Sequence, residues 1–439
     1  MSSRIRFMLL LTFAISILSI SASAMAQDKV VVKVWMNDDD LGQCVKDVVT
    51  TGFNAFSKDS EVEVDLQPNV DDTLKTALAG GAGPDIIPIV SPIASQQYAK
   101  AGLLLPLDEY VTKLEWDKLF IPWALEMGKF DGKLYTLPDS LETLVIWYNK
   151  TVFEENGWKI PKTMDELVTL SKTIHDAGVI PFSNGFGECL ECLGSLPGAF
   201  INHYAGPEKM YQALTGQIPW TDPVFVEAVT IFNDMVQKGY WDGSRDRLFT
   251  DSFDTAHQTL GSGEAAMYLD GSWAEGFVSG SFGSAAGNKN DYDWFPIPTK
   301  NGDEMFMTSL GAALSINVNS KHPQEAAEYL NWAFSPAAQT ERFNKCDFAF
   351  APIRIDADAL SQAKPRTARI YAAYAKNAAE GRYGYANWTF FPDDMNTAFS
   401  TDIQKVLLGT LTPEAYMQEM QDLYTKAVAD GTVPPIPAR

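Results

Sequence analysis

Two side chains that could bind a polar ligand lie in loops beside predicted strands. Glu142 precedes the apolar run 144–148, and Trp273 follows the turn Gly271-Ser272. A carboxylate accepts hydrogen bonds from hydroxyl groups, and an indole ring offers a flat apolar face. Loops that supply both groups can hold a molecule with hydroxyls on its edge and C–H groups on its faces. We therefore predict that Glu142 and Trp273 line a ligand site; the alternatives are a solvated charge between two domains for Glu142 and core packing for Trp273.

Other candidate ligand residues also lie where predicted strands meet loops. Asn37, Asp39 and Asp40 follow the apolar run 30–36, although a solvated loop with Asp40 as a helix cap explains them equally well. The weaker candidates are Ser91, Glu188, Ser309, Gly311 and Trp388. Trp388 lies in an aromatic run, which is more typical of a core than of a ligand platform.

A catalytic site is a competing hypothesis, because Asp and Glu could serve as the acid and base of a secreted hydrolase. With 56 acidic residues some pair always looks suitable, so their number carries no weight. Four histidines fit no metal or triad spacing: His175, His203, His257 and His322. The glycines at 80–83 precede a predicted strand and no Lys-Ser or Lys-Thr follows them, unlike a phosphate loop. We expect no catalytic residue, metal or cofactor.

Length and charge limit the class of protein. The chain has 439 residues, enough for at least two cores, and 46% of them are hydrophobic. The formal net charge of −22 makes nucleic acid or an anionic membrane an unfavourable partner. The acidic loop 38–40 leaves one alternative ligand class open, which is a polyamine or another cation.

Residues 1–26 have the three parts of a secretory signal peptide. Arg4 and Arg6 precede an apolar run over 7–20, and Ala24-Met25-Ala26 forms a cleavage site, so we predict cleavage near Ala26. A membrane anchor is the alternative, but the run is short. The first cysteine, Cys44, lies well beyond this segment, so the signal has no cysteine for lipid attachment. We predict a soluble periplasmic protein of a Gram-negative bacterium.

The four cysteines are an even set for an oxidising compartment. Cys44, Cys189, Cys192 and Cys346 allow two disulfides in three pairings. We predict a local Cys189–Cys192 bridge and a second bridge between Cys44 and Cys346. A zinc site is less favoured because Cys44 and Cys346 are not spaced like a second zinc knuckle.

The sequence predicts a β-α-β unit among the elements that position these residues. The run 30–36 predicts a buried strand, a helix follows, and the alternation over 61–66 predicts a strand with one solvated face. Ligands of open α/β sheets bind beyond the carboxyl ends of such strands, so the loop after residue 36 is a predicted ligand loop. The run 144–148 predicts a strand buried on both faces, and 307–317 predicts one returning strand.

Two helices have clear start signals. Thr163 and Glu166 form a capping box, and Thr412-Pro413 opens a C-terminal helix. The apolar positions of this second helix are predicted to face inward: Met417, Met420, Tyr424 and Val428.

Several sequence motifs of the chain resemble those of one protein family. The pattern G-K-L-Y-x-L-P over 132–138 leads into Y-N-K at 148–150, and G-x-x-P-D-I-I spans 81–87. P-x-T-x-x-E-L begins at Pro161, and G-x-A-A-M-x-x-x-G-x-W spans 263–273. In these phrases the sequence resembles the family 1 extracellular solute-binding proteins of ABC importers, the maltose-binding-protein-like group, over essentially the whole mature chain.

The resemblance implies an α/β, two-lobe periplasmic binding protein fold of type II with three interlobe crossovers near residues 141, 305 and 354. We expect each lobe to be an α/β sandwich around a mostly parallel sheet. The N-terminal lobe would comprise 27–141 plus 306–353, and the C-terminal lobe 142–305 plus 354–439. It implies a monomer that binds a carbohydrate between the lobes and delivers it to an inner-membrane ABC permease, without enzymatic activity. Glu142 and Trp273 match the family's ligand positions. Asp40 stands where the maltose-binding relative has a cation, so maltose-like recognition is not implied.

Overall fold

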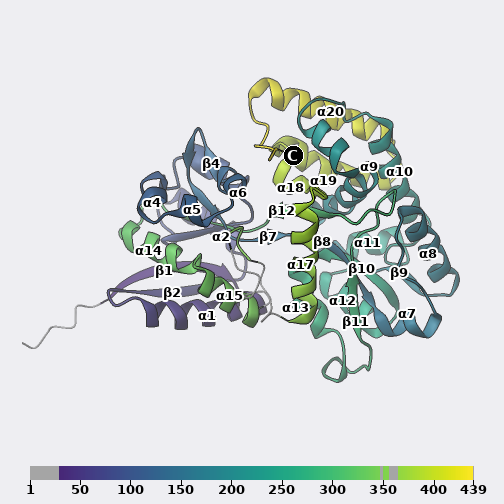
Figure 1. Ribbon diagram of the computed structural model, residues 1–439, viewed down its shortest axis with the longest axis horizontal. Coiled ribbons are helices and arrows are strands. Elements are labelled where there is room, and N and C mark those ends of the chain that lie inside the picture. Colours follow the sequence, from purple (N-terminus) through teal and green to yellow (C-terminus); the bar gives the residue numbers. More distant parts are fainter. Residues whose placement is uncertain (1–28, 347–349, 355–363, 439) are drawn as a thin grey trace, which may run out of the picture.

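The computed structural model describes residues 29–346, 350–354 and 364–438, and the predicted signal peptide lies outside these ranges. Figure 1 shows two lobes side by side. The chain starts in the first lobe, continues through the second, returns to the first with α14 and α15, and ends in the second with α20. Among the helices of the described ranges, none has the length and apolar composition to cross a membrane.

The first lobe is built on a five-stranded sheet. Its strands, in spatial order, are β2 (Ser60–Gln67), β1 (Val30–Asn37), β3 (Ile86–Ile89), β13 (Ala313–Ile316) and β6 (Thr136–Pro138). β1 is parallel to β2 and β3, whereas β13 is antiparallel to β3 and β6. Val32 and Val34 of β1 pack in one core with Phe53 and Ile86. The predicted β-α-β unit is therefore confirmed.

Helices and a small hairpin cover this sheet. They are α1 (Asp40–Phe56), α2 (Val70–Ala79), α3 (Ser95–Lys100), α4 (Asp108–Lys113), α5 (Trp116–Leu119), α6 (Pro122–Glu126), α14 (Pro323–Ala333), α15 (Pro336–Cys346) and the hairpin β4 (Lys129–Phe130) and β5 (Lys133–Leu134). Residues 80–83 form the turn between α2 and β3, as predicted, and not a phosphate loop before a helix.

The second lobe contains a four-stranded sheet. Its strands, in spatial order, are β11 (Tyr292–Phe295), β8 (Leu144–Asn149), β10 (Ala265–Gly271) and β9 (Ile180–Phe182). Ile146 and Trp147 of β8 belong to different cores, so β8 is buried on both faces, as predicted. A mostly parallel sheet was expected in each lobe, but β8 is antiparallel to both neighbours. β8 enters from the other lobe and not through a crossover helix of its own sheet, which reverses its direction.

Helices surround this second sheet. They are α7 (Lys150–Asn156), α8 (Met164–Asp176), η1 (Leu190–Gly194), α9 (Ser195–Leu214), α10 (Pro223–Gln237), α11 (Arg245–Thr250), α12 (Phe253–Ser262), η2 (Ser272–Ala274), α13 (Glu275–Gly280), η3 (Ser284–Ala286), α17 (Pro365–Ala379), α18 (Asn387–Phe390), α19 (Asp393–Leu407) and α20 (Pro413–Asp430). The capping box of α8 is confirmed, because the Glu166 N–H donates to Thr163 Oγ1 at 3.2 Å and Glu166 Oε2 accepts from the Thr163 N–H at 3.3 Å. Val428 is 55% exposed, so its predicted inward position is wrong.

Three segments connect the lobes. A small sheet with the order β14 (Tyr383–Tyr385), β12 (Phe306–Leu310) and β7 (Leu141–Glu142) contains the first two. The single returning strand predicted over 307–317 is two strands, β12 and β13, separated by Gly311 and Ala312. Ile353 pairs with Phe120 in the first lobe, and α17 belongs to the second. The third crossover was predicted near residue 354, and residues 355–363 lie outside the described ranges.

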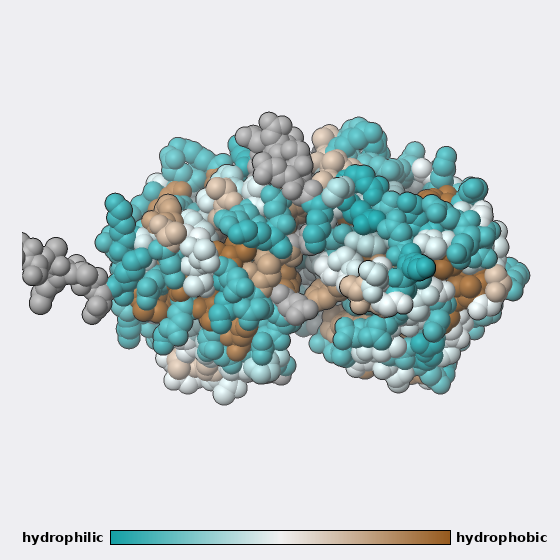
Figure 2. Space-filling model, turned by 90° about the horizontal axis from the view of Figure 1, so that it is seen from below, coloured by the Kyte–Doolittle hydropathy of each residue, from teal (hydrophilic) through white to brown (hydrophobic). Residues whose placement is uncertain are grey.

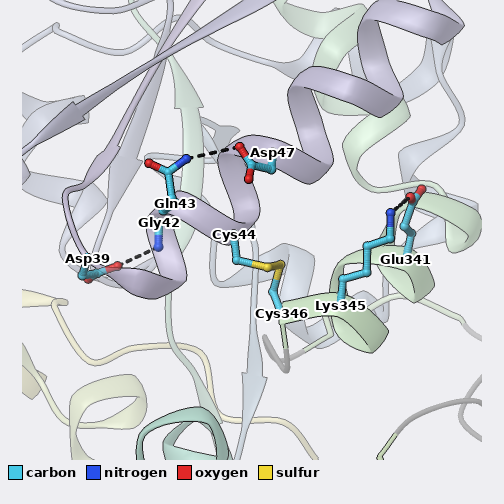
Figure 3. Close-up of a disulfide and its surroundings, with 8 residues drawn as sticks. All are labelled: Asp39, Gly42, Gln43, Cys44, Asp47, Glu341, Lys345 and Cys346. Atoms are coloured by element: carbon cyan, nitrogen blue, oxygen red, sulfur yellow. Dashed lines mark hydrogen bonds and ion pairs between the residues drawn. A yellow bond between two sulfur atoms is a disulfide. The ribbon is translucent and has the colours of Figure 1, made fainter. Parts of the chain in front are cut away.

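Both predicted disulfides are present. Cys44 is bonded to Cys346 across 302 residues, and Cys189 to Cys192 within η1 and the residue before it. Figure 3 shows that the first of these joins α1 to the last turn of α15. The chain therefore links an early and a late segment of the first lobe covalently.

Candidate functional site

The first lobe presents two candidate loops at one edge of its sheet. β2 and β3 lie on opposite sides of β1, so the strand order reverses between β1 and β3. Ligands of open α/β sheets bind beyond the carboxyl ends of the strands at such a reversal. Asn37 ends β1 and Ser91 follows β3, so both lie at this edge.

The loop after β1 is fixed by its own hydrogen bonds. Asn37 Oδ1 accepts from the N–H of Val70 at 3.2 Å, and Asp39 Oδ1 accepts from the N–H of Gly42 at 2.6 Å. Asp39 is thus the N-cap of α1, and the expectation that Asp40 caps this helix is wrong because Asp40 is already its first helical residue. Asn37 and Asp39 are both exposed and can also meet a ligand.

Ser91 and Glu188 each hold a helix end. Ser91 is buried and its Oγ accepts from the N–H of Ala94 at 3.2 Å, just before α3. Glu188 is exposed, and its Oε2 accepts from the N–H of Phe253 at 3.1 Å, in the first turn of α12. These contacts give both residues a local structural role.

The crossover strands bring three other candidates together. Pro138 and Ala313 are paired at the same edge of the first sheet, and the chain runs from there into β7 and β12. Ser309 is paired with Glu142, and its Oγ donates to the Glu142 carbonyl at 3.0 Å. A Cβ on Gly311 would lie only 1.9 Å from Glu142 Oε1, so the carboxylate of Glu142 lies directly over Gly311.

The carboxylate of Glu142 is partly buried and lies near other acids. Burial raises the pKa of Glu142 to about 7, against a hydrogen bond of 2.6 Å from Ser140 Oγ that lowers the pKa. The charges of Asp270 and Asp139 raise this pKa further. Burial also raises the pKa of Asp270 to about 6. Each carboxyl can accept hydrogen bonds, and in the protonated form it can also donate one.

The second lobe contributes an aromatic pair. The N–H of Ser272 donates to the Thr143 carbonyl at 2.8 Å, which places the turn after β10 beside the residue that follows Glu142. Trp273 lies in this turn and is half-buried, with its ring centroid 6.3 Å from that of Trp388 in an edge-to-face arrangement. A Cβ on Gly271 would lie 2.1 Å from the Trp273 ring, so glycine is required before this turn.

Five of the candidate residues therefore lie at the junction of the lobes. Figure 2 shows the surface hollowed between the two lobes. Glu142, Ser309 and Gly311 lie on the crossovers, and Trp273 and Trp388 lie on the second lobe. Within the described ranges, no group of three His, Cys, Asp or Glu side chains is arranged to hold a metal ion.

Comparison with known proteins identifies the family. Residues 45–340 match the family described as bacterial extracellular solute-binding protein. The chain belongs to this family. The members of the family are solute-binding proteins of the cell exterior, so this solute-binding protein works outside the cytoplasm.

Individual relatives are distant in sequence and similar in fold. This solute-binding protein is 25% identical to the maltotriose-binding protein of Pyrococcus abyssi over 326 residues, which are 73% of this chain and 66% of that protein. It is 25% identical to the multiple sugar-binding protein of Streptococcus mutans over 74% of this chain and 75% of that protein. A solved structure of a chitin oligosaccharide binding protein superposes with a TM-score of 0.74 at 23% identity, covering 92% of this chain and all of that one. These matches establish the two-lobe type II fold.

The structure places two acids near Glu142 that the sequence analysis did not name as candidates. Asp270 is half-buried near Glu142; its Oδ2 accepts from Tyr268 Oη at 2.6 Å, and its Oδ1 accepts from the N–H of Gly271 at 2.7 Å. Asp270 directly precedes the Gly-Ser-Trp turn, and this position in the sequence could have marked it as a candidate ligand residue. Asp139 is buried, and both of its carboxylate oxygens accept from Arg342 Nη1, Oδ1 at 2.9 Å and Oδ2 at 3.0 Å. This pair spans 203 residues, so no local pattern could have predicted it.

Proposed function

We propose that this solute-binding protein binds a carbohydrate in the cleft between its lobes and delivers it to an inner-membrane ABC permease. The observation that carries the proposal is the position of Glu142. It lies on a crossover strand over Gly311, with Asp270 and the Trp273 turn beside it. The carboxyls suit sugar hydroxyls, and the two indole rings suit the C–H faces of a sugar ring.

Sugar binding by relatives supports the ligand class. The relatives named above are a maltotriose-binding protein and a multiple sugar-binding protein. One solved structure of the same fold, with a TM-score of 0.67, is a complex with raffinose. These proteins differ in the sugars that they bind, so the class of ligand carries over and a particular sugar does not.

Residues from both lobes and the crossovers form the proposed site. The proposed ligand residues are Asn37, Asp39, Asp40, Glu142, Asp270, Trp273, Ser309, Gly311 and Trp388. Ser91 and Glu188 are left out of this set, because their side chains hold helix ends. The proposed lobes comprise 27–141 plus 306–353 and 142–305 plus 354–439. A ligand that contacts both lobes favours the closed arrangement by its extra contacts, and the permease would recognise that arrangement.

The proposal includes the cellular setting. The protein would work as a monomer in the periplasm after cleavage near Ala26, and it would bind no nucleic acid. It would return the bound sugar chemically unchanged, because transport requires hinge motion and no covalent step.

Thermal unfolding of the mature protein tests the ligand class. The panel contains maltotriose, raffinose, diacetylchitobiose, sorbitol, spermidine and inorganic phosphate. A sugar present at about 100 times its Kd should stabilise the protein by about 2.7 kcal/mol, and binding should persist at high salt because a neutral ligand is not screened. A response to spermidine alone, lost with salt, would replace the sugar by a cation. Consumption of the sugar, followed by chromatography, would make the protein a hydrolase.

A pair of tryptophan variants tests the site. Trp273→Ala should weaken sugar binding at least about tenfold, as expected for a buried aromatic anchor. Trp158→Ala is the matched control, because Trp158 is also half-buried but packs against Phe153 beside α7. Calorimetric titration gives the affinities and urea unfolding gives the stabilities. If both variants lose stability equally and bind sugar equally well, Trp273 belongs to the core and not to the cleft.

A further inference from the structure

The last turn of α15 contacts three segments that carry the proposed site, although its own residues are outside it. Arg342, Phe343 and Cys346 make these contacts. Arg342 contacts the first crossover, Phe343 contacts the second lobe, and Cys346 is bonded to the helix that follows the loop after β1. This turn is called the α15 hub below.

Arg342 holds the first crossover. Its guanidinium binds the Asp139 carboxylate through Nη1 and the Asp139 carbonyl through Nη2 at 3.1 Å, and both side chains are buried. The crossover continues from Asp139 to Ser140, whose Oγ donates to Glu142. The Ser140 carbonyl also accepts from the N–H of Gly311 at 3.1 Å. Arg342 thus determines where the strand that carries Glu142 leaves the first lobe.

Phe343 reaches the second lobe. Its ring stacks on Phe350 with centroids 4.0 Å apart and meets the Tyr371 ring of α17 edge to face at 5.4 Å. Tyr371 Oη donates to the Leu141 carbonyl at 3.2 Å and lies 3.2 Å from Ser272 Oγ. Ser272 directly precedes Trp273. The hub therefore packs against the tyrosine that ties the first crossover to the tryptophan turn.

Cys346 joins the hub to the loop after β1. Its disulfide partner Cys44 lies at the start of α1, as Figure 3 shows, two residues after Gly42. Gly42 is held by Asp39, and a Cβ on Gly42 would lie 2.0 Å from the Asn37 carbonyl oxygen. The first turn of α1 and the candidate loop are consequently one tightly packed unit, which the disulfide connects to α15.

We propose that the α15 hub, held by the Cys44–Cys346 disulfide, positions the two halves of the ligand cleft relative to the crossovers. The proposal rests on the proposed function. The contacts that carry it are discrete: one ion pair, one aromatic junction and one covalent bond. A network of such contacts beside a hinge can transmit a change at one end to the other.

Removal of the disulfide tests the proposal. The C44S/C346S variant should bind its sugar about 3- to 30-fold more weakly, the range found when residues coupled to a site are changed. The probe is whichever of maltotriose, raffinose and diacetylchitobiose stabilises the wild-type protein, titrated by calorimetry. The C189S/C192S variant is the matched control, because it removes a disulfide that joins residues only three positions apart in the second lobe. Its affinity should stay within about twofold of wild type.

Hydrogen exchange in the ligand-free protein separates positioning from simple stabilisation. In C44S/C346S, exchange should speed up at the amides of Gly42, Gly311 and Ser272, which are bonded to Asp39, Ser140 and Thr143. The Ala415 amide, capped by Thr412 in α20, should exchange as in wild type. Unchanged affinity and unchanged exchange at the three amides, even with a lower unfolding midpoint, would overturn the proposal and leave the disulfide a stability bond. If the wild-type protein binds none of the sugars, the proposed function fails. The exchange result still tests whether the α15 hub positions the segments around the cleft.

A second route applies if the double variant does not fold. Folded C189S/C192S protein retains only the Cys44–Cys346 disulfide. Dithiothreitol converts that bond to two thiols and is itself oxidised to its cyclic disulfide. Affinity and exchange are then compared before and after reduction. The same loss of affinity and the same faster amides support the hub, and their absence contradicts it.

Discussion

Two effects act in opposite directions on the carboxyl group of Glu142. Sugar hydroxyls need an acceptor, whereas burial disfavours the carboxylate charge and raises the pKa of Glu142 from 4.5 to about 7. Between these two pH values the folded protein holds a proton that the unfolded chain has released. The stability contributed by this group is therefore fully present below about pH 4.5 and is lost as the pH rises through about 7.

Glu142→Gln should remove this dependence. We expect the variant to be more stable than wild type by about 1–3 kcal/mol at about pH 8, with almost no difference at about pH 4. Urea unfolding at several pH values measures the effect. Burial also raises the pKa of Asp242 to about 7. Asp242 therefore gives both proteins a remaining loss of stability with rising pH. Glu155→Gln, at an exposed position of α7, is the control and should follow the wild-type profile. If Glu142→Gln follows it too, the buried titrating group is not Glu142.

The sequence supplied candidate ligand residues, but not the local hydrogen bonds that hold them in place. Trp273 and Glu142 were predicted because each follows or precedes a short apolar strand at a recognisable turn. Asp39 and Ser91 lie in predicted loops, yet their helix-end hydrogen bonds were not foreseen because caps depend on where a helix begins, which sequence defines only within a residue or two.

At the scale of elements, the pair β7 and β12 builds the centre of the site. Two crossovers that run in opposite directions meet as antiparallel neighbours, which puts Ser309 opposite Glu142. The chain then breaks at Gly311 before β13 begins at Ala313. Glycine at this break leaves room for the Glu142 carboxylate, because any Cβ would overlap it.

Gly311→Ala should displace that carboxylate. Loss of a hydrogen bond from a charged group predicts sugar binding about 10- to 100-fold weaker. The cost to folding should be about 1–2 kcal/mol, since the overlapping atoms are the end of a side chain that can move. Gly276→Ala in α13 is the control, because a Cβ there meets no atom within 4 Å. Calorimetric titration compares them, and equal affinities would mean that Glu142 can move without loss of ligand contacts.

At the scale of the whole molecule, the buried apolar residues of the described chain form several separate cores. Val32 and Ile86 belong to one core, and Ile146 and Trp241 to another. The core around Ile146 also includes Ala124 and Met127 of the first lobe, so the lobes share apolar contacts next to the crossovers. Hinge closure would keep the interior of each lobe intact and change the contacts between them. The buried Asp139–Arg342 pair holds the start of the first crossover to the first lobe.

Ligand binding should therefore contract the molecule. Small-angle scattering of the mature protein should give a smaller radius of gyration with a saturating sugar than without it, because the ligand favours contacts with both lobes. Trp273→Ala at the same sugar concentration should show less contraction. A radius that stays constant while calorimetry shows full binding would exclude closure as the response to ligand.

The sequence by itself determined the local elements and the family. The runs over 30–36 and 144–148 became β1 and β8, and the Thr163–Glu166 box caps α8. These features depend on side-chain periodicity and on hydrogen bonds within a few residues, so a short stretch contains all the information needed. The family match over 45–340 agrees with the phrases that suggested it.

Tertiary structure alone decided how the site is assembled. Three features join segments that are far apart in the chain. Asp270 lies near Glu142, Arg342 forms an ion pair with Asp139, and β8 is antiparallel to β10. Such contacts arise from how two lobes pack around shared crossovers, and that packing is a property of the whole chain. Sequence could name candidate side chains, and only the fold could bring the carboxyls, the glycine and the indole rings to the same junction.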